Sequence, residues 1–302
     1  MSLSAYDELD VIGGGAASVD RILLVDAPLG DSKGRVLLEQ ERYGGNVATA
    51  MVAAARGGAT TAFVGHLPAR DVEPGLWQCL RHNGVRLDLA RTAPGQPGIR
   101  ATILVDPDGR RFIAVDDDAP IGLPDDLDLE LVRHAKVLLL DGYAVPAGVR
   151  AARAAREAGR GVVLDLEKVH HPETELLVDL SDHLVLPESF AVQWTGTNSP
   201  ARAIAALWRA DRCAVVITCG DRGAYFVSAD DGTALGTGVL DRIQHQSVPP
   251  VQVKDTTGCG DVFHGAYAAA LARGLPIAQC VAGATAAAAE CATRVGGIPA
   301  DS

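Results

Sequence analysis

The stretch VKDTTGCGDVFHGAYAAALARG, residues 253–274, decides how the fold of this chain is interpreted. In it, a turn of small and polar residues from Asp255 to Asp261 opens directly into an alanine-rich segment that we expect to be helical. The first N–H groups of a helix have no intrahelical acceptor, and small residues at 258–260 let the backbone come close to an anion. The pattern therefore predicts a phosphate-binding turn.

Asp261 comes directly after these small residues, at the start of the predicted helix. A carboxylate there can accept a proton from a substrate hydroxyl as its oxygen attacks a phosphate. An isolated Asp at a helix start would more simply be a cap. The Gly-Cys-Gly approach before Asp261 favours the role of a base. His264, three residues further on, either approaches the substrate or packs.

Short apolar runs recur before this turn and predict buried parallel strands. They lie at residues 10–14, 60–65, 136–141, 161–166, 183–187 and 213–218. Helical patterns fill intervals between them, at residues 47–58, 145–159 and 199–210. Such alternation predicts an α/β fold with a doubly wound, mostly parallel sheet flanked by helices.

Two segments break the alternation, at residues 21–41 and 98–118. Each has two β-like arms, and Asp106-Pro-Asp-Gly109 is a strong turn signal between the arms of the second segment. We interpret both as antiparallel hairpins that form a small β lid over the ligand edge of the main sheet. The lid insertions are expected at about 20–43 and 98–118, in one body that spans residues 7–302.

Composition excludes several classes of protein. The chain has 302 residues, of which 48% are hydrophobic, so it can bury a large core. A formal net charge of −11 without a basic cluster argues against a nucleic-acid partner. Six scattered cysteines indicate reduced thiols. No apolar run has membrane-spanning length, so we expect a soluble cytoplasmic protein with no membrane partner.

The glycine run Gly13-x-Gly15-x-x-Ser18 is close to the dinucleotide-binding fingerprint. A true fingerprint opens into a helix, whereas this run is followed by a β-like segment that breaks at Pro28. We therefore expect these glycines to form a sharp turn beside the substrate pocket.

Residues 255–263 resemble the C-terminal signature of the ribokinase (PfkB) family of carbohydrate kinases, and residues 44–50, GGNVATA, resemble its N-terminal one. The residues of both signatures are most similar to those of the ketohexokinase-like and sulfofructose-kinase-like branch of the family. The resemblance implies a ribokinase-like α/β core with a β lid. It also implies transfer of the γ-phosphate of ATP to a hydroxyl of a small-molecule sugar, with Mg²⁺ as cofactor and Asp261 as general base.

Carried over residue by residue, the resemblance implies four groups of site residues. The anion hole beside the base would be Gly258, Cys259 and Gly260. The sugar would be bound by Ser18, Asp20, Gly44, Gly45, Asn46 and Thr49. The nucleotide would be bound by Thr218, Gly220, Gly223 and Glu188, together with Gly258 and Gly260. A monovalent-cation site, for K⁺, would be bordered by Asp255 and Thr257.

The chain departs from the family pattern at two places. Thr49 stands where ribokinases carry a second Asn. The Asn-x-x-Glu element that helps to arrange Mg²⁺ has no clean copy near residues 187–190, where Glu188 is a partial substitute.

One alternative function is a nucleoside kinase of the same family, which the low aromatic content of 4% disfavours. Another is a non-catalytic sugar- or nucleotide-binding paralogue. The exposed face of a small lid also makes a homodimer through the lid an expectation.

Overall fold

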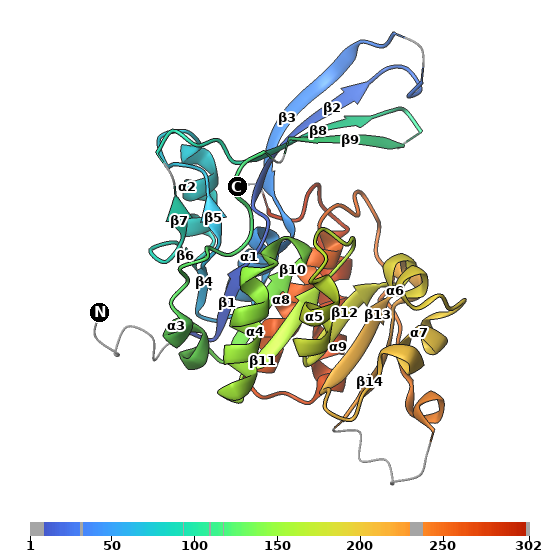
Figure 1. Cartoon of the computed structure of the whole chain (residues 1–302). Helices are drawn as coiled ribbons and strands as arrows, with labels where there is room; N and C mark the ends of the chain where they lie inside the picture. The colour runs from blue at the N-terminus through green and yellow to red at the C-terminus, as the bar shows by residue number, and fades with distance from the viewer. Residues whose placement is uncertain are drawn as a thin grey trace.

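The described residues form a nine-stranded central sheet in the order β15-β14-β13-β12-β11-β10-β1-β4-β6 (Figure 1). The computed structural model describes residues 9–30, 33–92, 94–108, 110–116, 118–229 and 238–299. The strands from β13 to β6 run parallel, while β14 and β15 add an antiparallel edge. The strands are β1 Val11–Gly14, β4 Thr61–Phe63, β6 Val85–Arg86, β10 Val137–Asp141, β11 Gly161–Asp165, β12 His183–Pro187, β13 Ala214–Thr218, β14 Ala224–Ser228 and β15 Gln244–Gln246.

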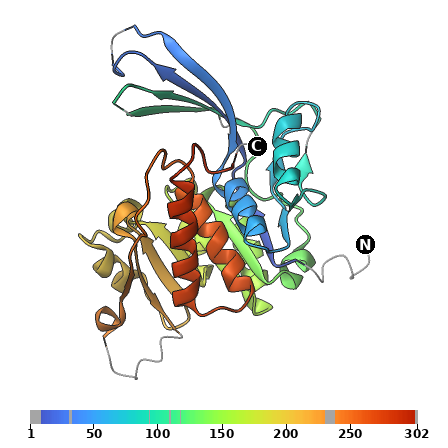
Figure 2. The same cartoon turned by 180° about the vertical axis from the view of Figure 1, so that it is seen from behind.

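Helices cover both faces of this sheet (Figures 1 and 2). One layer contains α1 Asn46–Arg56, α2 Pro74–His82, α8 Cys259–Ala272 and α9 Ile277–Cys291. The other contains α3 Leu129–His134, α4 Ala147–Glu157, α5 Thr174–Leu180, α6 Glu188–Thr195 and α7 Pro200–Leu207. Strand side chains alternate between the layers: Leu139 packs in the first, and Leu138 and Leu140 pack in the second. The predicted doubly wound α/β fold is confirmed.

The two predicted hairpins form a separate lid sheet of order β3-β2-β8-β9, which projects beyond the carboxyl ends of the central strands (Figure 1). Its strands are β2 Ser18–Val25, β3 Val36–Gly44, β8 Ile99–Val105 and β9 Arg111–Asp116. Each hairpin is antiparallel, but β2 joins β8 in parallel. A small parallel pair, β5 His66–Leu67 and β7 Arg91–Thr92, lies beside the body.

The turn of the second hairpin is organised by the buried carboxylate of Asp106. Its Oδ1 accepts hydrogen bonds from the backbone N–H groups of Asp108 at 3.0 Å and Arg110 at 2.9 Å. This matches the predicted turn chemistry. Gly109 and Asp117, which belong to the predicted segment, lie outside the described residues.

The glycine run after β1 forms a turn and no dinucleotide fingerprint. Strand β1 ends at Gly14 and β2 begins at Ser18, so no helix follows the glycines. A Cβ at Gly15 would lie 2.4 Å from the carboxylate of Asp141. Glycine is therefore required because the chain passes directly over the end of β10.

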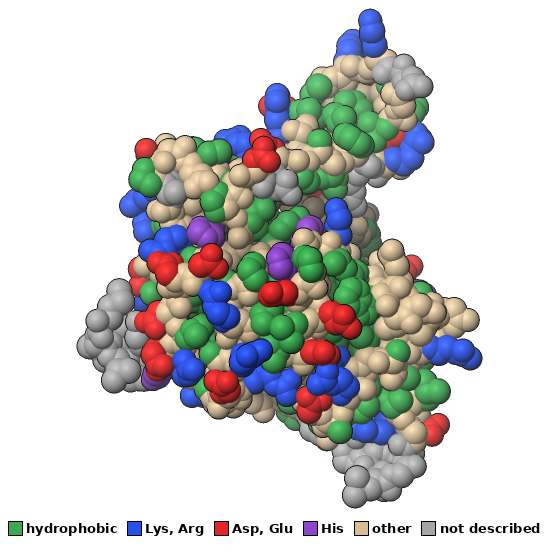
Figure 3. All heavy atoms as spheres, viewed as in Figure 1, with side chains coloured by type: hydrophobic (Ala, Val, Ile, Leu, Met, Phe, Trp, Pro, Cys, Tyr) green, Lys and Arg blue, Asp and Glu red, His purple; other side chains and the backbone are tan. Residues whose placement is uncertain are grey.

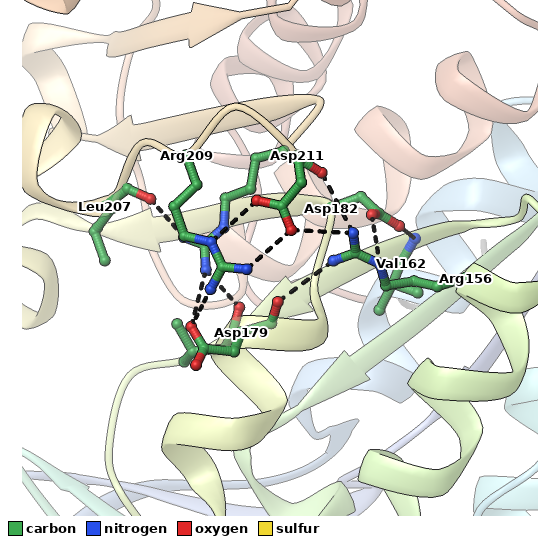
Figure 4. A network of polar contacts seen from close by, with 9 residues as sticks. Arg156, Val162, Asp179, Asp182, Leu207, Arg209 and Asp211 are labelled. Atoms are coloured by element: carbon green, nitrogen blue, oxygen red, sulfur yellow. Dashed lines mark hydrogen bonds and ion pairs between the residues drawn. The ribbon is translucent and has the colours of Figure 1, made fainter.

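A polar network ties helices and loops together at the opposite, amino-terminal edge of the strands (Figure 4). Arg156 of α4 contacts Asp182 at 3.4 Å and Asp211 at 3.3 Å. Arg209 binds Asp211 at 2.9 Å and lowers the pKa of that carboxyl to about 2. The buried guanidinium of Arg212 donates to two backbone carbonyl groups. Because this edge is remote from the predicted turn, we assign the network to stability.

The described residues also include the short 3₁₀ helices η2 Gly142–Ala144, η3 Gly220–Arg222 and η4 Val239–Arg242. All six cysteines are free thiols. Within the part of the chain that the structure describes, no helix combines the length and apolar character needed to cross a membrane.

Candidate active site

Two carboxylates meet at the carboxyl edge of the central sheet because neighbouring parallel strands both end in Asp. Asp141 ends β10, Asp165 ends β11, and the two residues are partners in the strand register. Both are 2% exposed. The Asp141 carboxylate accepts hydrogen bonds from the N–H groups of Ala16 at 2.7 Å and Tyr143 at 2.9 Å. The edge of the sheet thus gathers negative charge where parallel α/β folds bind ligands.

The predicted phosphate-binding turn faces this edge and is held by its own first residue. Asp255 Oδ1 accepts from the backbone N–H of Thr257 at 2.9 Å and from its hydroxyl at 2.8 Å, and Oδ2 accepts from the N–H of Gly296 at 2.9 Å. Gly258 precedes α8 with φ of 77°, a left-handed conformation that favours glycine. The turn is therefore fixed before α8 begins at Cys259.

A cavity of about 490 Å³ opens in front of the α8 N-terminus. Its lining includes Cys259 and Gly260 of α8. It also includes the predicted nucleotide-binding residues Thr218, Gly220 and Gly223. Most of the remaining wall is apolar and comes from a loop and from α9, namely Val248, Pro249, Pro250, Val251, Val253, Thr285, Ala288, Ala289 and Ala292. Asp221, Thr256 and Phe263 also line the cavity. A pocket with one apolar wall and one polar end suits a ligand with a flat apolar group and an anionic tail.

A second polar cluster comes from the lid and α1, and none of its residues lines this cavity. The hydroxyl of Ser18 donates to Asp20 at 2.8 Å, and a Cβ at Gly44 would lie 2.6 Å from the Asp20 carboxylate. Asn46 begins α1 and donates from Nδ2 to Asp165 Oδ2 at 3.3 Å. The predicted sugar residues thus reach the sheet edge through Asn46.

Asp261 lies in the first turn of α8 and is partly accessible. Its pKa is raised well above 3.8, first by burial and then by the charges of Asp165, Glu167 and Asp141. Burial also raises the pKa of Asp141 to about 7, with a further contribution from Asp165. Glu167 follows the same pattern, because burial and Asp165 raise its pKa. A carboxylate with a raised pKa is a stronger proton acceptor once it is ionised.

The cavity wall also contains a thiol, but not a reactive one. A hydrogen bond to Cys291, followed by burial, raises the pKa of Cys259. A raised pKa keeps the thiol protonated, and thiols react as thiolates. The small size of Cys259 at the predicted anion hole is therefore a sufficient reason for this residue.

Four predicted site residues make contacts other than those expected. Thr49 is 2% exposed, and its methyl group lies 3.6 Å from the position of a Cβ at Gly258, so it packs beneath the turn that precedes α8. Glu188 forms an ion pair with Arg222 of η3. Asp255 and Thr257 bind each other, as described above. A sugar contact for Thr49 and a cation site at residues 255 and 257 stay predictions.

The sequence interpretation missed Asp165 and Glu167 as neighbours of Asp261. A signal was present, because two of the predicted parallel strands, VLLLD and GVVLD, both end in Asp. Parallel neighbours place such residues side by side only if the strands are adjacent, and the strand order is a tertiary property. The apolar cavity wall had no comparable signal, because it combines a loop with one face of α9.

Comparison with known proteins adds an independent observation. The family model for pfkB family carbohydrate kinases matches residues 10–302. Ribokinase from Arabidopsis thaliana is 30% identical over 228 residues, which cover 72% of this chain and 57% of that protein. The bifunctional ribokinase/ribose-5-phosphate isomerase A of Fructilactobacillus sanfranciscensis is 30% identical over 271 residues, which cover 85% of this chain and 47% of that protein. The chain thus spans about half the length of these relatives.

A solved structure of Arabidopsis thaliana ribokinase complexed with ribose and ATP is similar over nearly the whole fold. The TM-score is 0.82 at 26% identity, and the match covers 96% of this chain and 95% of that one. The similarity includes both the central sheet and the lid region because so little of either chain is left out.

Gly258→Ala tests the turn that precedes α8. A Cβ at this position would lie 2.5 Å from the Cα of Gly297, in addition to the cost of φ of 77°. We expect a loss of about 1–2 kcal/mol from the backbone conformation and about 1–3 kcal/mol from the clash, measured by urea unfolding. Gly274→Ala is the matched control, because Gly274 has φ of 72° and no atom near its Cβ position. Equal losses in the two variants would contradict the packing described here.

Proposed function

Because this chain belongs to the pfkB family of carbohydrate kinases, we propose that it transfers the γ-phosphate of ATP to a hydroxyl group of a small sugar in the cytoplasm, with Asp261 as general base. The observation that carries the proposal is the position of Asp261. It stands between a helix N-terminus that lines a 490 Å³ cavity and a carboxylate cluster that reaches Asn46. A nucleotide on one side and an alcohol on the other would meet at this residue.

The cavity suits ATP in both size and chemistry. Its volume falls within the range of small-molecule sites, roughly 300–1,000 Å³. The apolar wall of Val251, Ala288 and Ala289 would accept the flat base. The phosphates would then extend toward Gly260, where first-turn N–H groups and the helix dipole favour negative charge.

A neutral sugar is the acceptor that the other side supports. Asp141, Asp165 and Glu167 are close enough to Asp261 for their charges to raise its pKa, and Asp20 of β2 adds a further carboxyl group from the lid. Carboxylates accept hydrogen bonds from hydroxyl groups, and they repel phosphate, sulfonate or carboxylate substituents. This charge pattern disfavours an anionic sugar. The small number of aromatic side chains likewise gives a nucleoside base little to stack on.

The proposed reaction is an in-line displacement. The sugar hydroxyl oxygen attacks the γ-phosphorus, the bond from that phosphorus to the bridging oxygen of the β-phosphate breaks, and ADP leaves. The hydroxyl proton passes to the carboxylate of Asp261. The N–H groups at the start of α8 stabilise the negative charge on the phosphoryl oxygens during transfer.

Glu188 is the residue that fits a role toward Mg²⁺, because oxygen donors are the ligands that this ion prefers. Glu188 is the first residue of α6, directly after β12, and already pairs with Arg222 of η3, and Gly220 and Asp221 of η3 line the cavity. When bound with ATP, Mg²⁺ supplies positive charge to the phosphates. Glu188 would share its carboxylate between Arg222 and this assembly.

Replacing the base tests the central assignment. Asp261→Asn keeps the shape of the side chain but cannot accept the proton, so we expect kcat to fall by about 10²–10⁴-fold. Dissociation constants for ATP, measured by calorimetry, should change little because the cavity wall is intact. An Asn variant that folds normally and turns over at the wild-type rate, across fructose, ribose, 2-keto-3-deoxygluconate and adenosine, would remove Asp261 from the reaction.

Filling the apolar wall tests where the base of ATP binds. Ala288→Phe places a ring in the cavity, so we expect KM for ATP to rise at least about tenfold while KM for the sugar changes little. Ala286→Phe is the matched control, because Ala286 lies on the same helix, is exposed and does not line the cavity. Two variants with the same KM for ATP would place the nucleotide elsewhere.

A homodimer through the lid also belongs to this proposal. On one face of the lid, the register brings together the aliphatic residues Ile22, Leu24, Leu38, Ile103, Ile113 and Val115. Leu38, Ile113 and Val115 are between 42% and 52% exposed, and Figure 3 shows hydrophobic side chains gathered on the lid. Monomeric proteins seldom expose a contiguous apolar patch of this kind. The lid of a second copy of this chain is the simplest partner that would bury this apolar face.

Ile113→Lys places a charge on this face and should convert a dimer into a monomer, as measured by analytical ultracentrifugation. Phe112→Lys is the matched control: Phe112 is the neighbouring residue of β9 and points to the opposite face, where it is also exposed. A wild-type chain that sediments as a monomer would contradict the dimer.

A further inference from the structure

His264 lies in an unusual polar environment beneath the proposed active site. The ring is 3% exposed. Nδ1 lies 2.7 Å from the carbonyl oxygen of Gly260 and Nε2 lies 2.8 Å from the carbonyl oxygen of Val185. Carbonyl oxygens only accept hydrogen bonds, so each ring nitrogen must donate. A neutral imidazole has one N–H group and would turn a lone pair toward one of these oxygens.

A negative charge that matches a doubly protonated ring lies beside it. Asp165 Oδ1 is 3.6 Å from His264 Nε2. This oxygen is buried, and within the described residues it has no hydrogen-bond partner. An unpaired buried carboxylate is costly, whereas a neighbouring cation repays much of that cost. The ring and Asp165 therefore complement each other as an imidazolium and a carboxylate.

The pair connects the two halves of the proposed reaction centre. On one side, His264 Nδ1 contacts the carbonyl oxygen of Gly260. Gly260 lines the proposed nucleotide cavity and directly precedes Asp261. On the other side, Asp165 Oδ2 accepts from Asn46, the first residue of α1. Val185 anchors the ring to β12 of the central sheet. A single buried chain of contacts thus links the phosphate side to the sugar side.

We propose that His264 is a buried imidazolium that positions the reaction centre, because it ties the α8 turn to β12 and holds Asp165 in the ionised form that binds Asn46. It is a positioning residue and touches neither substrate. Its effect on catalysis rests on the proposed function, whereas its charge and contacts do not.

The imidazolium also adds a positive charge to a negative cluster. The ionisable groups that face this region are Asp141 from β10, Asp165 and Glu167 from the end of β11, and Asp261 on α8 itself. Loss of a nearby cation disfavours the ionised form of Asp261, so its pKa rises; loss of a nearby carboxylate has the opposite effect. Since the base must be ionised to act, kcat/KM falls as the pH decreases through the pKa of Asp261.

Two substitutions with opposite charge effects test the proposal. In His264→Gln the acid limb of the kcat/KM profile should move to higher pH by about one unit, and in Asp165→Asn it should move to lower pH by a similar amount. The double variant should return toward the wild-type position. His183→Gln is the matched control, because His183 is also buried on β12 and its Nδ1 meets the hydroxyl of Tyr267 at 2.9 Å, an arrangement that requires no charge. Its acid limb should not move.

A purely structural role would lower the melting temperature of both variants and leave the acid limb in place, which would overturn the proposal. A direct measurement covers the case in which the variants do not fold. In the ¹⁵N-labelled wild-type protein at pH 7.5, long-range ¹H–¹⁵N spectra should show protons on both ring nitrogens of His264. A ring with one protonated nitrogen would refute the imidazolium. If the wild-type chain phosphorylates no sugar, the proposed function fails and this spectrum still decides the protonation of His264.

Discussion

The structure depends on how it tolerates several buried carboxyl groups at one edge of the sheet. Asp141 and Asp165 are adjacent in the register, and the charges of Asp165, Glu167 and Asp141 add to burial in raising the pKa of Asp261. Like charges in a region of low dielectric constant repel, so this cluster needs positive partners. The N–H groups of residues 16 and 143 donate hydrogen bonds that stabilise the carboxylate of Asp141. The positive end of the α8 dipole stabilises negative charge on Asp261. The consequence is that Asp261, the proposed base, has a raised pKa and lies beside the turn that precedes α8.

The rest of the fold brings these groups together. Parallel strands deliver their carboxyl ends to one edge, and the glycine turn after β1 lets the chain pass over Asp141. The lid adds Asp20 from β2, while the α1 N-terminus adds Asn46. On the other flank, α9 and the loop at residues 248–253 build the apolar cavity wall. Each element thus contributes to one of two regions that adjoin at Asp261.

Much of this arrangement could be predicted from the sequence because its signals are local. Apolar runs predicted the parallel strands, the Asp106 turn marked the second hairpin, and residues 255–261 predicted the turn that opens into α8. The remaining features depend on long-range packing. Asp165 becomes a neighbour of Asp261 only through strand order, Glu188 at the start of α6 meets Arg222 of η3, and Thr49 packs under Gly258 because α1 and α8 are in contact. No local pattern distinguishes these outcomes from their alternatives.

The most direct test of the account is a crystal structure of the chain with a non-hydrolysable ATP analogue and a sugar that it phosphorylates. The account predicts that the terminal phosphate lies within hydrogen-bond distance of the N–H groups at the start of α8, and that one sugar hydroxyl lies between this phosphate and the carboxylate of Asp261. A terminal phosphate bound away from the α8 N-terminus, or a reacting hydroxyl paired with a different base, would contradict it.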